Sequence, residues 1–315
     1  MIWLTWRQHR LEGLVTVGVV AVIGAFLLVT GREMATSYQQ LGLSHCLGQT
    51  APGSPCPDLI MAFGSRYGLL LFFDNMLIFL PLLLGALVGA PLIAREVEQR
   101  THLLVWTQSI TRQRWLTVKL ALILSAGVVV SGALLALLIW WYQPWAKLNG
   151  AFGSSAYDTS GPVWIAATLL ALALGTLAGA LTRRVVAAIF LTIVLFVAIR
   201  APVENLWRPH FEAPITRINS ISGQASNQPA LSDQDWVIDQ GYIDAQGNKH
   251  DDIITCSTNG NPENCLQAKG VKAFYVSYQP ADRFWTFQWI ETGIYLGFAA
   301  LALFGAYWLI RHRLN

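Results

Sequence analysis

The chain has 315 residues, of which 54% are hydrophobic and 12% charged, and its mean hydropathy is +0.45. Soluble domains carry roughly 25% charged residues, so this composition excludes an ordinary water-soluble globule. The abundance of apolar residues also excludes intrinsic disorder. The formal net charge of +3, from 21 Lys and Arg against 18 Asp and Glu, gives no reason to expect nucleic acid binding. The composition therefore indicates a membrane protein.

Six long apolar runs predict transmembrane helices, because about 20 apolar residues are needed to cross a bilayer core of about 30 Å. In chain order they are residues 13–31, 67–94, 116–142, 162–181, 185–201 and 289–310. The fifth run has only 15 residues between Arg184 and Arg200, which is about 22 Å of helix. It either crosses with both arginines reaching the interface or forms a re-entrant hairpin with the fourth run. We favour a crossing, because Arg183 and Arg184 make a tight basic turn typical of the cytoplasmic side.

The basic residues orient these helices, since short cytoplasmic loops carry an excess of Lys and Arg. One side holds Arg7, Arg10, Arg95, Arg100, Arg112, Arg114, Lys119, Arg183, Arg184, Arg311 and Arg313. The short loops of the other side hold only Arg32, Arg66 and Lys147. We therefore expect an all-α polytopic membrane protein with six transmembrane helices and cytoplasmic N and C termini.

The four cysteines agree with this orientation. Cys46 and Cys56 lie in the first predicted outer loop, and Cys256 and Cys265 lie in the long outer segment. Two local pairs in an oxidising exterior predict the disulfides Cys46–Cys56 and Cys256–Cys265. A zinc site made of four thiolates is the competing interpretation, but no Cys-x-x-Cys spacing supports it.

Residues 202–288, between the fifth and sixth predicted helices, have the composition of a soluble module with Gly and Asn turn signals. Residues 271–278 are rich in aromatic and β-branched types, which predicts a strand, and residues 253–255 are its expected partner. This segment is therefore predicted to form a small mixed α/β extracellular cap. Asp251 and Asp252 fit a solvated turn better than a calcium loop, because they lack its regularly spaced oxygen ligands.

The motifs of several enzyme classes are absent from the sequence. There is no Gly-x4-Gly-Lys-Ser/Thr phosphate loop and no His-Glu-x-x-His zinc motif, and no histidine lies within a predicted span. Ser125 and Ser131 lie in the third span, but no other span offers a His or Lys to activate them. Asp74 and Glu291 are the only acidic residues in the spans and lie near their outer ends, which does not favour a carrier driven by an ion gradient. We expect no enzyme activity, no metal and no cofactor in this chain.

The most informative segment is the predicted cytoplasmic loop 95–115, between the second and third spans. It contains, in order, Glu96 and Glu98, a short amphipathic helix with Leu103, Leu104 and Trp106, a polar turn at 107–109, and a basic re-entry at Arg112 and Arg114. Its apolar anchors with flanking charge could dock into a groove of another protein. They could equally hold the segment on the lipid headgroups, and the residues alone favour the two interpretations about evenly.

This loop resembles the segment after the second helix in permeases of type-2 ABC exporters. The residues that carry the resemblance are Ala94–Leu104, Thr107–Ser109, Arg112, Arg114, Trp115 and Lys119. The family pattern is acidic-x-acidic-x-Gly-Thr, a short helix, a turn and a basic residue. Arg100 replaces the family's glycine, which is a departure in the local turn. The six-helix order, the outer region before the last helix and an amphipathic N-terminal segment, here residues 1–12, are similar to the family as well.

The resemblance implies that loop 95–115 is a coupling helix that seats in a separate ATPase subunit, which would bind ATP and Mg. The implied ATPase-coupling residues are Glu96, Glu98, Thr101, His102, Trp106, Thr107, Gln108 and Arg112. Two permeases, identical or related, would assemble with two ATPase subunits in the bacterial plasma membrane, in contact with lipid. Residues 13–201 would hold helices one to five with this loop, and residues 289–315 the sixth helix and a short tail.

The predicted function is that of a multi-pass permease subunit that moves a hydrophobic or amphiphilic substrate outward. Candidate residues of the translocation path, at the outer end of the second span, are Phe72, Phe73, Asp74, Asn75 and Phe79. The competing interpretation is that the aromatic rings face lipid and that Asp74 bonds a neighbouring helix. The alternative function is a membrane-anchored sensor or assembly factor, because the predicted cap is large relative to the other outer loops and could bind a ligand.

Overall fold

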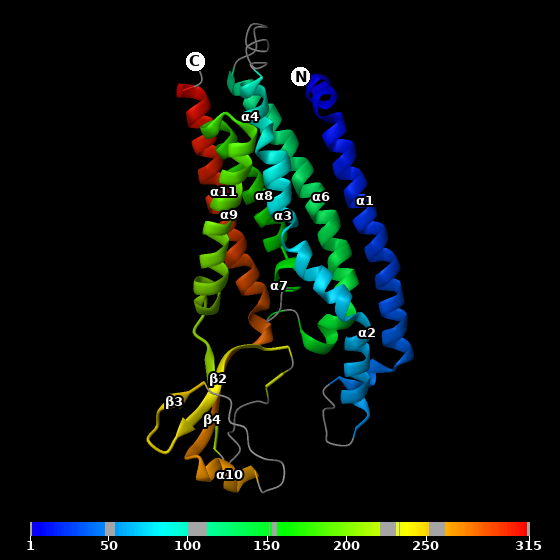
Figure 1. Ribbon diagram of the computed structural model, residues 1–315, viewed down its shortest axis with the longest axis vertical. Coiled ribbons are helices and arrows are strands. Elements are labelled where there is room, and N and C mark those ends of the chain that lie inside the picture. Colours follow the sequence, from blue (N-terminus) through cyan, green and yellow to red (C-terminus); the bar gives the residue numbers. More distant parts are fainter. Residues whose placement is uncertain are drawn as a thin grey trace.

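The computed structural model describes residues 2–47, 54–99, 112–150, 152, 156–220, 231, 232, 234–251 and 262–313. Long helices run side by side as a bundle, and a small sheet lies at one end of it (Figure 1). The N and C termini both lie at the other end (Figure 1). We call these two ends the sheet end and the loop end, the latter because α4 ends there and α6 begins there.

The helices of the bundle follow the apolar runs of the sequence. They are α1 (Ile2–Gln40), α2 (Cys56–Leu77), α3 (Leu80–Leu84), the π-helical turn η2 (Gly85–Gly89), α4 (Pro91–Glu98), α6 (Arg112–Asn149), the short α7 (Ala156–Thr159), α8 (Val163–Thr182), α9 (Val185–Pro202) and α11 (Phe284–Arg313). Because α1 is continuous from Ile2, the described part of the predicted N-terminal segment 1–12 and the first predicted span belong to one helix.

Seven stretches of the described chain are long and apolar enough to cross a membrane, against the six expected. They are Val17–Gln40, Cys56–Leu77, Leu80–Glu98, Gln113–Leu148, Val163–Thr182, Val185–His210 and Ala281–His312. The extra stretch arises because the predicted second span is divided. A turn at Ile78 and Phe79 ends α2, and Pro81 opens α3, where its missing N–H is not needed. The two parts still succeed each other along the long axis of the bundle (Figure 1).

The fifth predicted span is longer than the sequence indicated. After α9 the helical path continues through the π-helical turn η3 (Val203–Trp207) and the 3₁₀ turn η4 (Arg208–His210), which makes a run of 26 residues. Arg200 therefore does not end this helix but lies inside it and is buried. The run is therefore long enough to cross a membrane, and Arg200 does not shorten it because its charge is paired within the protein.

At the centre of the bundle, α8 is buried over most of its length and packs against α11, α9, α6 and the α3–α4 segment. Its contact with the latter depends on two Gly-x-x-x-Gly sequences, 85–89 and 175–179. A Cβ atom added to Gly175 would lie 2.4 Å from the carbonyl oxygen of Gly85. Small residues let two helix backbones approach this closely, which is a common basis of helix association in membranes.

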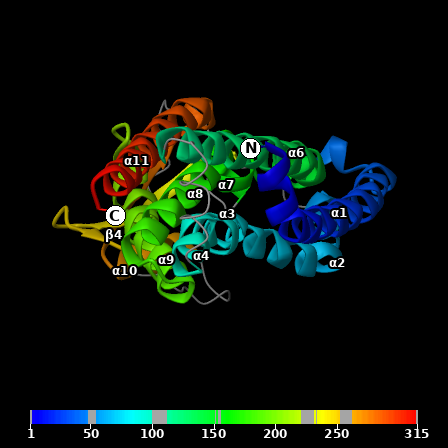
Figure 2. The same cartoon turned by 90° about the horizontal axis from the view of Figure 1, so that it is seen from above.

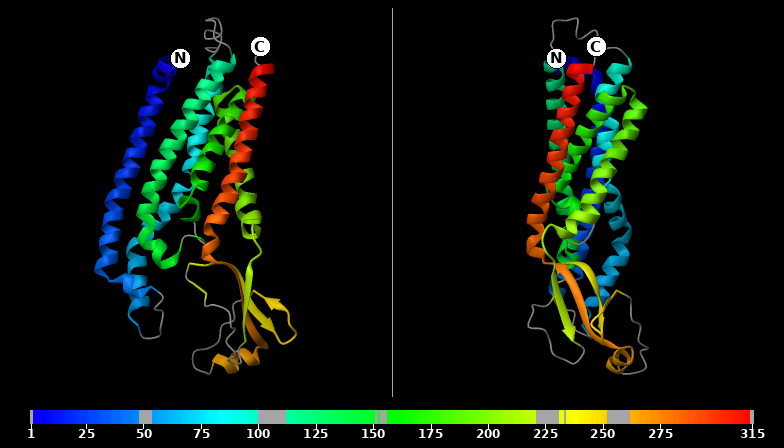
Figure 3. Two further views of the ribbon diagram at one scale, coloured as in Figure 1. Left: turned by 180° about the vertical axis from the view of Figure 1, so that it is seen from behind. Right: turned by 90° about the vertical axis from the view of Figure 1, so that its left-hand side faces the viewer.

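The sheet is antiparallel with the strand order β1 (Ile215–Ser220), β4 (Val271–Gln279), β2 (Trp236–Asp244) and β3 (Lys249–His250), and the helix α10 (Pro262–Ala268) precedes β4 (Figure 3). The predicted strand 271–278 is confirmed. Its neighbours are β1 and β2, which occupy both of its edges. The pairing with residues 253–255 is therefore wrong for this stretch of β4, and those residues lie outside the described part of the chain.

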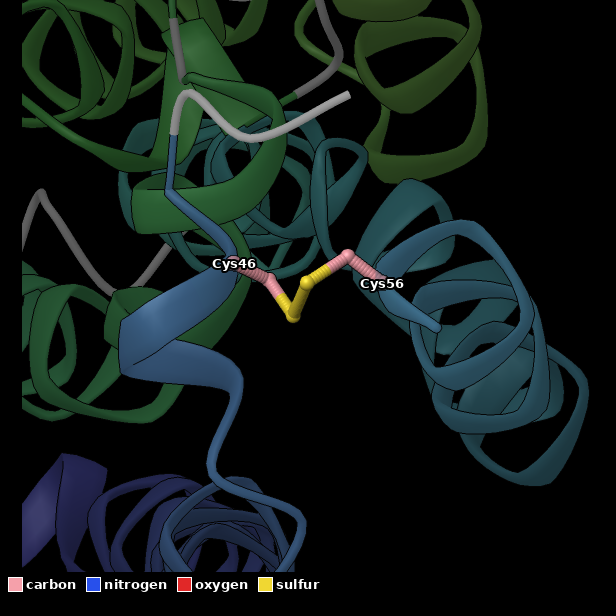
Figure 4. The surroundings of a disulfide bond; sticks show 2 residues. All are labelled: Cys46 and Cys56. Carbon is pink, nitrogen blue, oxygen red and sulfur yellow. A yellow bond between two sulfur atoms is a disulfide. The ribbon is translucent and has the colours of Figure 1, made fainter. Parts of the chain in front are cut away.

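One predicted disulfide is confirmed. Cys46, at the end of the turn that follows α1, is bonded to Cys56, the first residue of α2, with an S–S distance of 2.02 Å (Figure 4). Cys265 is also disulfide-bonded. Its expected partner, Cys256, lies outside the described residues.

Aromatic side chains join the sheet to the bundle. The ring of Phe152 lies 5.5 Å from that of Trp236 on β2 and 5.1 Å from that of Phe287 on α11. On the opposite face of α11, Trp285 and Trp289 are 57% and 62% exposed. Amphipathic rings one helical turn apart and facing outward suit the boundary between lipid and water.

Candidate functional site

Five charged side chains, four of them buried and one half-buried, lie together where the bundle meets the sheet. This sheet-end cluster consists of Asp158 on α7, Arg200 on α9, Glu204 on η3, Arg208 on η4 and Glu291 on α11. Glu291 is completely inaccessible, and Asp158, Arg200 and Arg208 are each less than 10% exposed. The cluster thus gathers the charges of three segments that are distant in sequence.

Arg208 is the centre of this cluster. Its guanidinium donates two hydrogen bonds to the Glu291 carboxylate, Nε to Oε2 and Nη2 to Oε1, both at 2.7 Å. The same Nη2 donates to Asp158 Oδ1 at 2.8 Å. Such a forked, charge-assisted arrangement fixes geometry as well as charge.

Arg200 extends the network from the other side of Asp158. Its Nη2 lies 3.2 Å from Asp158 Oδ2, and its Nε is ion-paired with Glu204. Both oxygens of Asp158 therefore face a guanidinium. Arg200, Glu204 and Arg208 are spaced four residues apart on one helical path, so they share one face of it. The ring of Tyr157 lies 4.3 Å from the Arg208 guanidinium carbon and adds a cation–π contact.

The three carboxylates of the cluster lie close enough to share a cation, with ligand oxygens within 4.8 Å of one another. Two guanidiniums already occupy these oxygens with positive charge. The arrangement therefore suits interlocked ion pairs better than a metal site. Removing Arg208 would leave the buried carboxylate of Glu291 without its ion-pair partner, which is costly.

Asp74 links this cluster to the break between α2 and α3. It is buried, and its Oδ1 lies 3.5 Å from Oγ1 of Thr159, the residue after Asp158. Phe73 also turns inward, with its ring 4.8 Å from that of Phe26 on α1. The other candidate path residues, Phe72, Asn75 and Phe79, are exposed on the surface of the chain. The five residues therefore do not share one face, and their role in a path stays a prediction.

At the loop end, Glu96 lies on the inner side of α4. Its side chain is buried and ion-paired with Lys119 of α6, which is itself only 4% exposed. The Lys119 ammonium also lies 4.8 Å from the centre of the Trp115 ring. The carboxylate of Glu96 thus joins α4 to α6.

Glu98, at the last turn of α4, contacts a different helix. Its Oε2 accepts a hydrogen bond of 3.0 Å from the backbone N–H of Val185, the first residue of α9. The preceding residue, Arg184, makes no side-chain cap to this helix. A carboxylate at a helix N-terminus satisfies a free N–H and complements the helix dipole. Glu98 thus caps α9 from a separate helix.

The remaining predicted coupling residues lie outside the described part of the chain. These are Thr101, His102, Trp106, Thr107 and Gln108. Arg112 is the first residue of α6, and its side chain is not among those described. Their contacts with an ATPase stay predictions.

Sequence reasoning missed the sheet-end cluster. One signal was present, since Arg200, Glu204 and Arg208 alternate in charge at four-residue spacing just beyond an apolar helix. Asp158 offered none, because it stands in a short connection without periodicity. The facing Gly-x-x-x-Gly sequences at 85–89 and 175–179 were also readable as helix contacts.

Comparison with known proteins identifies a family. A family model described as "ABC-2 membrane transporter related" matches residues 17–208, which is well over half of the chain. The matched region runs from α1 to Arg208 and leaves the sheet and α11 outside it. No curated protein and no solved structure matches the chain.

Proposed function

The chain belongs to the ABC-2 membrane transporter related family, and we propose that it is the membrane-spanning subunit of an ATP-binding-cassette exporter. As an ABC-2 type permease it is a multi-pass membrane protein without an ATPase site of its own. The family match over residues 17–208 is the observation that carries the proposal. ATP and Mg would be bound by a separate ATPase subunit docked on loop 95–115.

We propose six membrane crossings with both termini in the cytoplasm. The two termini lie at the same end of the bundle, which requires an even number of crossings (Figure 1). The stretches Cys56–Leu77 and Leu80–Glu98 follow one another along the bundle and together would make one broken crossing. The loop end carries the excess of basic residues, and the sheet end carries the Cys46–Cys56 disulfide, as expected for an oxidising exterior. The sheet and α10 would then form the extracellular cap.

A second permease, a copy of this chain or a relative, is proposed to cover the side formed by α2, α3, α4 and α9 (Figure 2). Large apolar side chains are exposed on these helices. On the α2–α3–η2 segment they include Leu69, Phe72, Met76, Phe79, Leu83 and Leu87, and on α9 they include Val186, Phe190, Val194 and Val197. The translocation path would run between the two permeases, and its apolar walls favour a hydrophobic or amphiphilic cargo over a sugar or an ion.

The sheet-end cluster ties three parts of this assembly together at the outer end. It joins the α9 helical path to α11 and α7, and Asp74 lies next to it at the break of the second crossing. If these helices move when cargo is released outward, the cluster either moves with them as a unit or loses its ion pairs. We propose that the cluster holds the outer ends of these helices together on this permease's side of the path.

The test is purification of the chain with a co-expressed ABC ATPase in a bacterial host, followed by reconstitution into vesicles. Inside-out vesicles supplied with ATP should accumulate a fluorescent phospholipid analogue or a hydrophobic dye, and they should not accumulate a fluorescent sugar. Deletion of residues 101–110 should abolish ATPase co-purification and transport while the permease stays monodisperse. Co-purification of a kinase or other regulator in place of an ATPase would overturn the proposal in favour of a sensor.

A further inference from the structure

The two acidic residues at the end of α4 contact two different helices of the permease: Glu96 is buried against α6, and the exposed Glu98 bonds the first residue of α9. We propose that Glu96 and Glu98 receive the movement of loop 95–115 and pass it on, Glu96 to α6 and Glu98 to α9, rather than contact the ATPase themselves. The inference rests on the proposed function and assigns these residues a positioning role within it.

Glu98 contacts α9 at its first residue, where a short turn restricts the movement of α9 relative to α8. Only Arg183 and Arg184 separate α8 from α9, and Arg183 has a left-handed backbone with φ of 57°. Residues other than glycine rarely adopt this conformation, so the surrounding structure has to hold it. The hydroxyl of Thr182 donates a hydrogen bond of 3.2 Å to the carbonyl of Arg184 and closes the turn. The Glu98 carboxylate joins the end of α4 directly to this stiff turn through Val185.

The Glu96–Lys119 pair holds the same end of α4 against α6. Both side chains are buried, and separating them would leave two opposite charges without compensation in an apolar setting. The two helices therefore stay together when α4 moves. Buried apolar side chains around the pair, among them Ile93, Trp115 and Leu116, add to this contact.

Burial makes Glu96 inaccessible to an ATPase surface, and one carboxylate oxygen of the exposed Glu98 is already engaged by the N–H of Val185. The spacing of two residues explains the division, because positions i and i+2 of a helix point in directions about 200° apart. Glu96 thus faces α6 while Glu98 reaches α9. In this proposal the acidic-x-acidic pattern lets one movement of α4 act on two helices. Loop residues such as Trp106 would contact the ATPase.

The experiment uses the full permease bound to its ATPase, with an environment-sensitive fluorophore on single introduced cysteines. Val186→Cys reports on α9 and Leu122→Cys on α6, since their side chains are 81% and 36% exposed. Cys46, Cys56 and Cys265 are disulfide-bonded and would not react. The readouts are the Kd of the ATPase for the permease and the fluorescence change on adding ATP with vanadate.

Glu98→Ala should leave the Kd within about twofold, because the residue lies outside the proposed contact with the ATPase. The ATP-dependent change at position 186 should fall by at least half, and Glu98→Gln, which keeps an acceptor oxygen, should restore part of it. The double variant Glu96→Gln with Lys119→Met removes both buried charges and should reduce the change at position 122 in the same way. Trp106→Ala is the matched control: it should weaken the ATPase by about tenfold and leave the signal of each bound complex unchanged.

A Kd weakened by about tenfold in Glu98→Ala would overturn the inference, because a direct ATPase contact would then be shown. An unchanged signal at position 186 with saturating ATPase would overturn it as well. Failure of the unmodified permease to bind any ABC ATPase would overturn the proposed function, and the inference with it. The three results are distinguishable, since the first two require a complex that forms.

Discussion

At the sheet end of the bundle, five charged side chains from three segments form one network of ion pairs, whereas at the loop end two carboxylates of one helix each contact a different neighbour. In the first arrangement every member has more than one contact with the others or is held by a forked pair. In the second, each link depends on a single carboxylate. The first resists displacement in any direction, and the second passes displacement from one helix to two others.

This difference agrees with the proposed function. In that proposal the loop end has to move when the ATPase closes, and the sheet end has to stay together until cargo is released. Substitutions in the sheet-end cluster should therefore lower the stability of the protein most, and substitutions in the exposed sheet should lower it least.

Arg208→Met should produce the largest loss. It leaves the carboxylates of Asp158 and Glu291 buried without their main partner, which costs about 3 to 5 kcal/mol of unfolding free energy. Thermal unfolding of the purified protein in detergent measures the effect. Arg32→Met on the exposed surface of α1 is the matched control and should stay within about 0.5 kcal/mol. Equal unfolding temperatures for the two variants would contradict the importance of the cluster.

Gly175→Ala should destabilise the centre of the bundle by about 1 to 3 kcal/mol, because the new methyl group would clash with the backbone at Gly85 and Ala90. Gly297→Ala on α11 is the control, since a Cβ atom there meets no atom within 4 Å. It should be neutral or stabilise the helix by up to about 1 kcal/mol. Should both variants unfold alike, the close approach of α8 to the α3–α4 segment would not be needed for stability.

Replacing Cys46 and Cys56 together with serine should cost about 2 to 3 kcal/mol, because the bond closes a loop with a sequence separation of 10. Comparison of thermal unfolding with that of the unmodified chain measures the loss. Intact cells offer a second measurement. After reduction, a membrane-impermeant maleimide should label these cysteines from outside, and labelling that requires broken cells would contradict the proposed orientation.

The smallest effect is expected from Asp244 in the β2–β3 hairpin. A hydrogen bond of 2.9 Å with His250 lowers the pKa of Asp244 to about 2. The unfolded chain, with an Asp pKa of about 3.9, binds more protons between these values, so the hairpin loses stability as the pH falls from about 4 to about 2. The stability difference between the unmodified chain and Asp244→Asn should therefore be present at pH 6 and shrink at about pH 2. A difference that does not depend on pH would show that the charge of Asp244 is irrelevant.

Much of the helical architecture could be predicted from the sequence, because apolar length alone decides where a helix can cross a membrane. The disulfide between Cys46 and Cys56 and the strand at 271–278 were predicted for similar local reasons. The break at Ile78 and Phe79 was not, although Pro81 lies next to it, because apolar residues continue on both sides. The extension of α9 to His210 was missed because Arg200 looked like the end of a span.

Part of the candidate site could likewise be predicted from the sequence, and part of it required the tertiary structure. Loop 95–115 was proposed as a coupling segment from its resemblance to the family, which stays a prediction, whereas the contacts of Glu96 and Glu98 depend on which helices pack beside α4. The sheet-end cluster needed tertiary structure even more, since its ion pairs join residues up to 83 positions apart.

Taken by itself, the sequence determined that this is a membrane protein, which short loops carry the excess of basic residues, and which loop resembles a coupling segment. These properties are sums over local composition, so no partner has to be known. The tertiary structure alone decided that Arg200 and Arg208 are neutralised inside the protein, that α2 and α3 are separate helices, and that Glu98 caps α9. Each of these depends on a contact between distant segments, and the periodicity of a helix shows which residues share a face but not what that face meets.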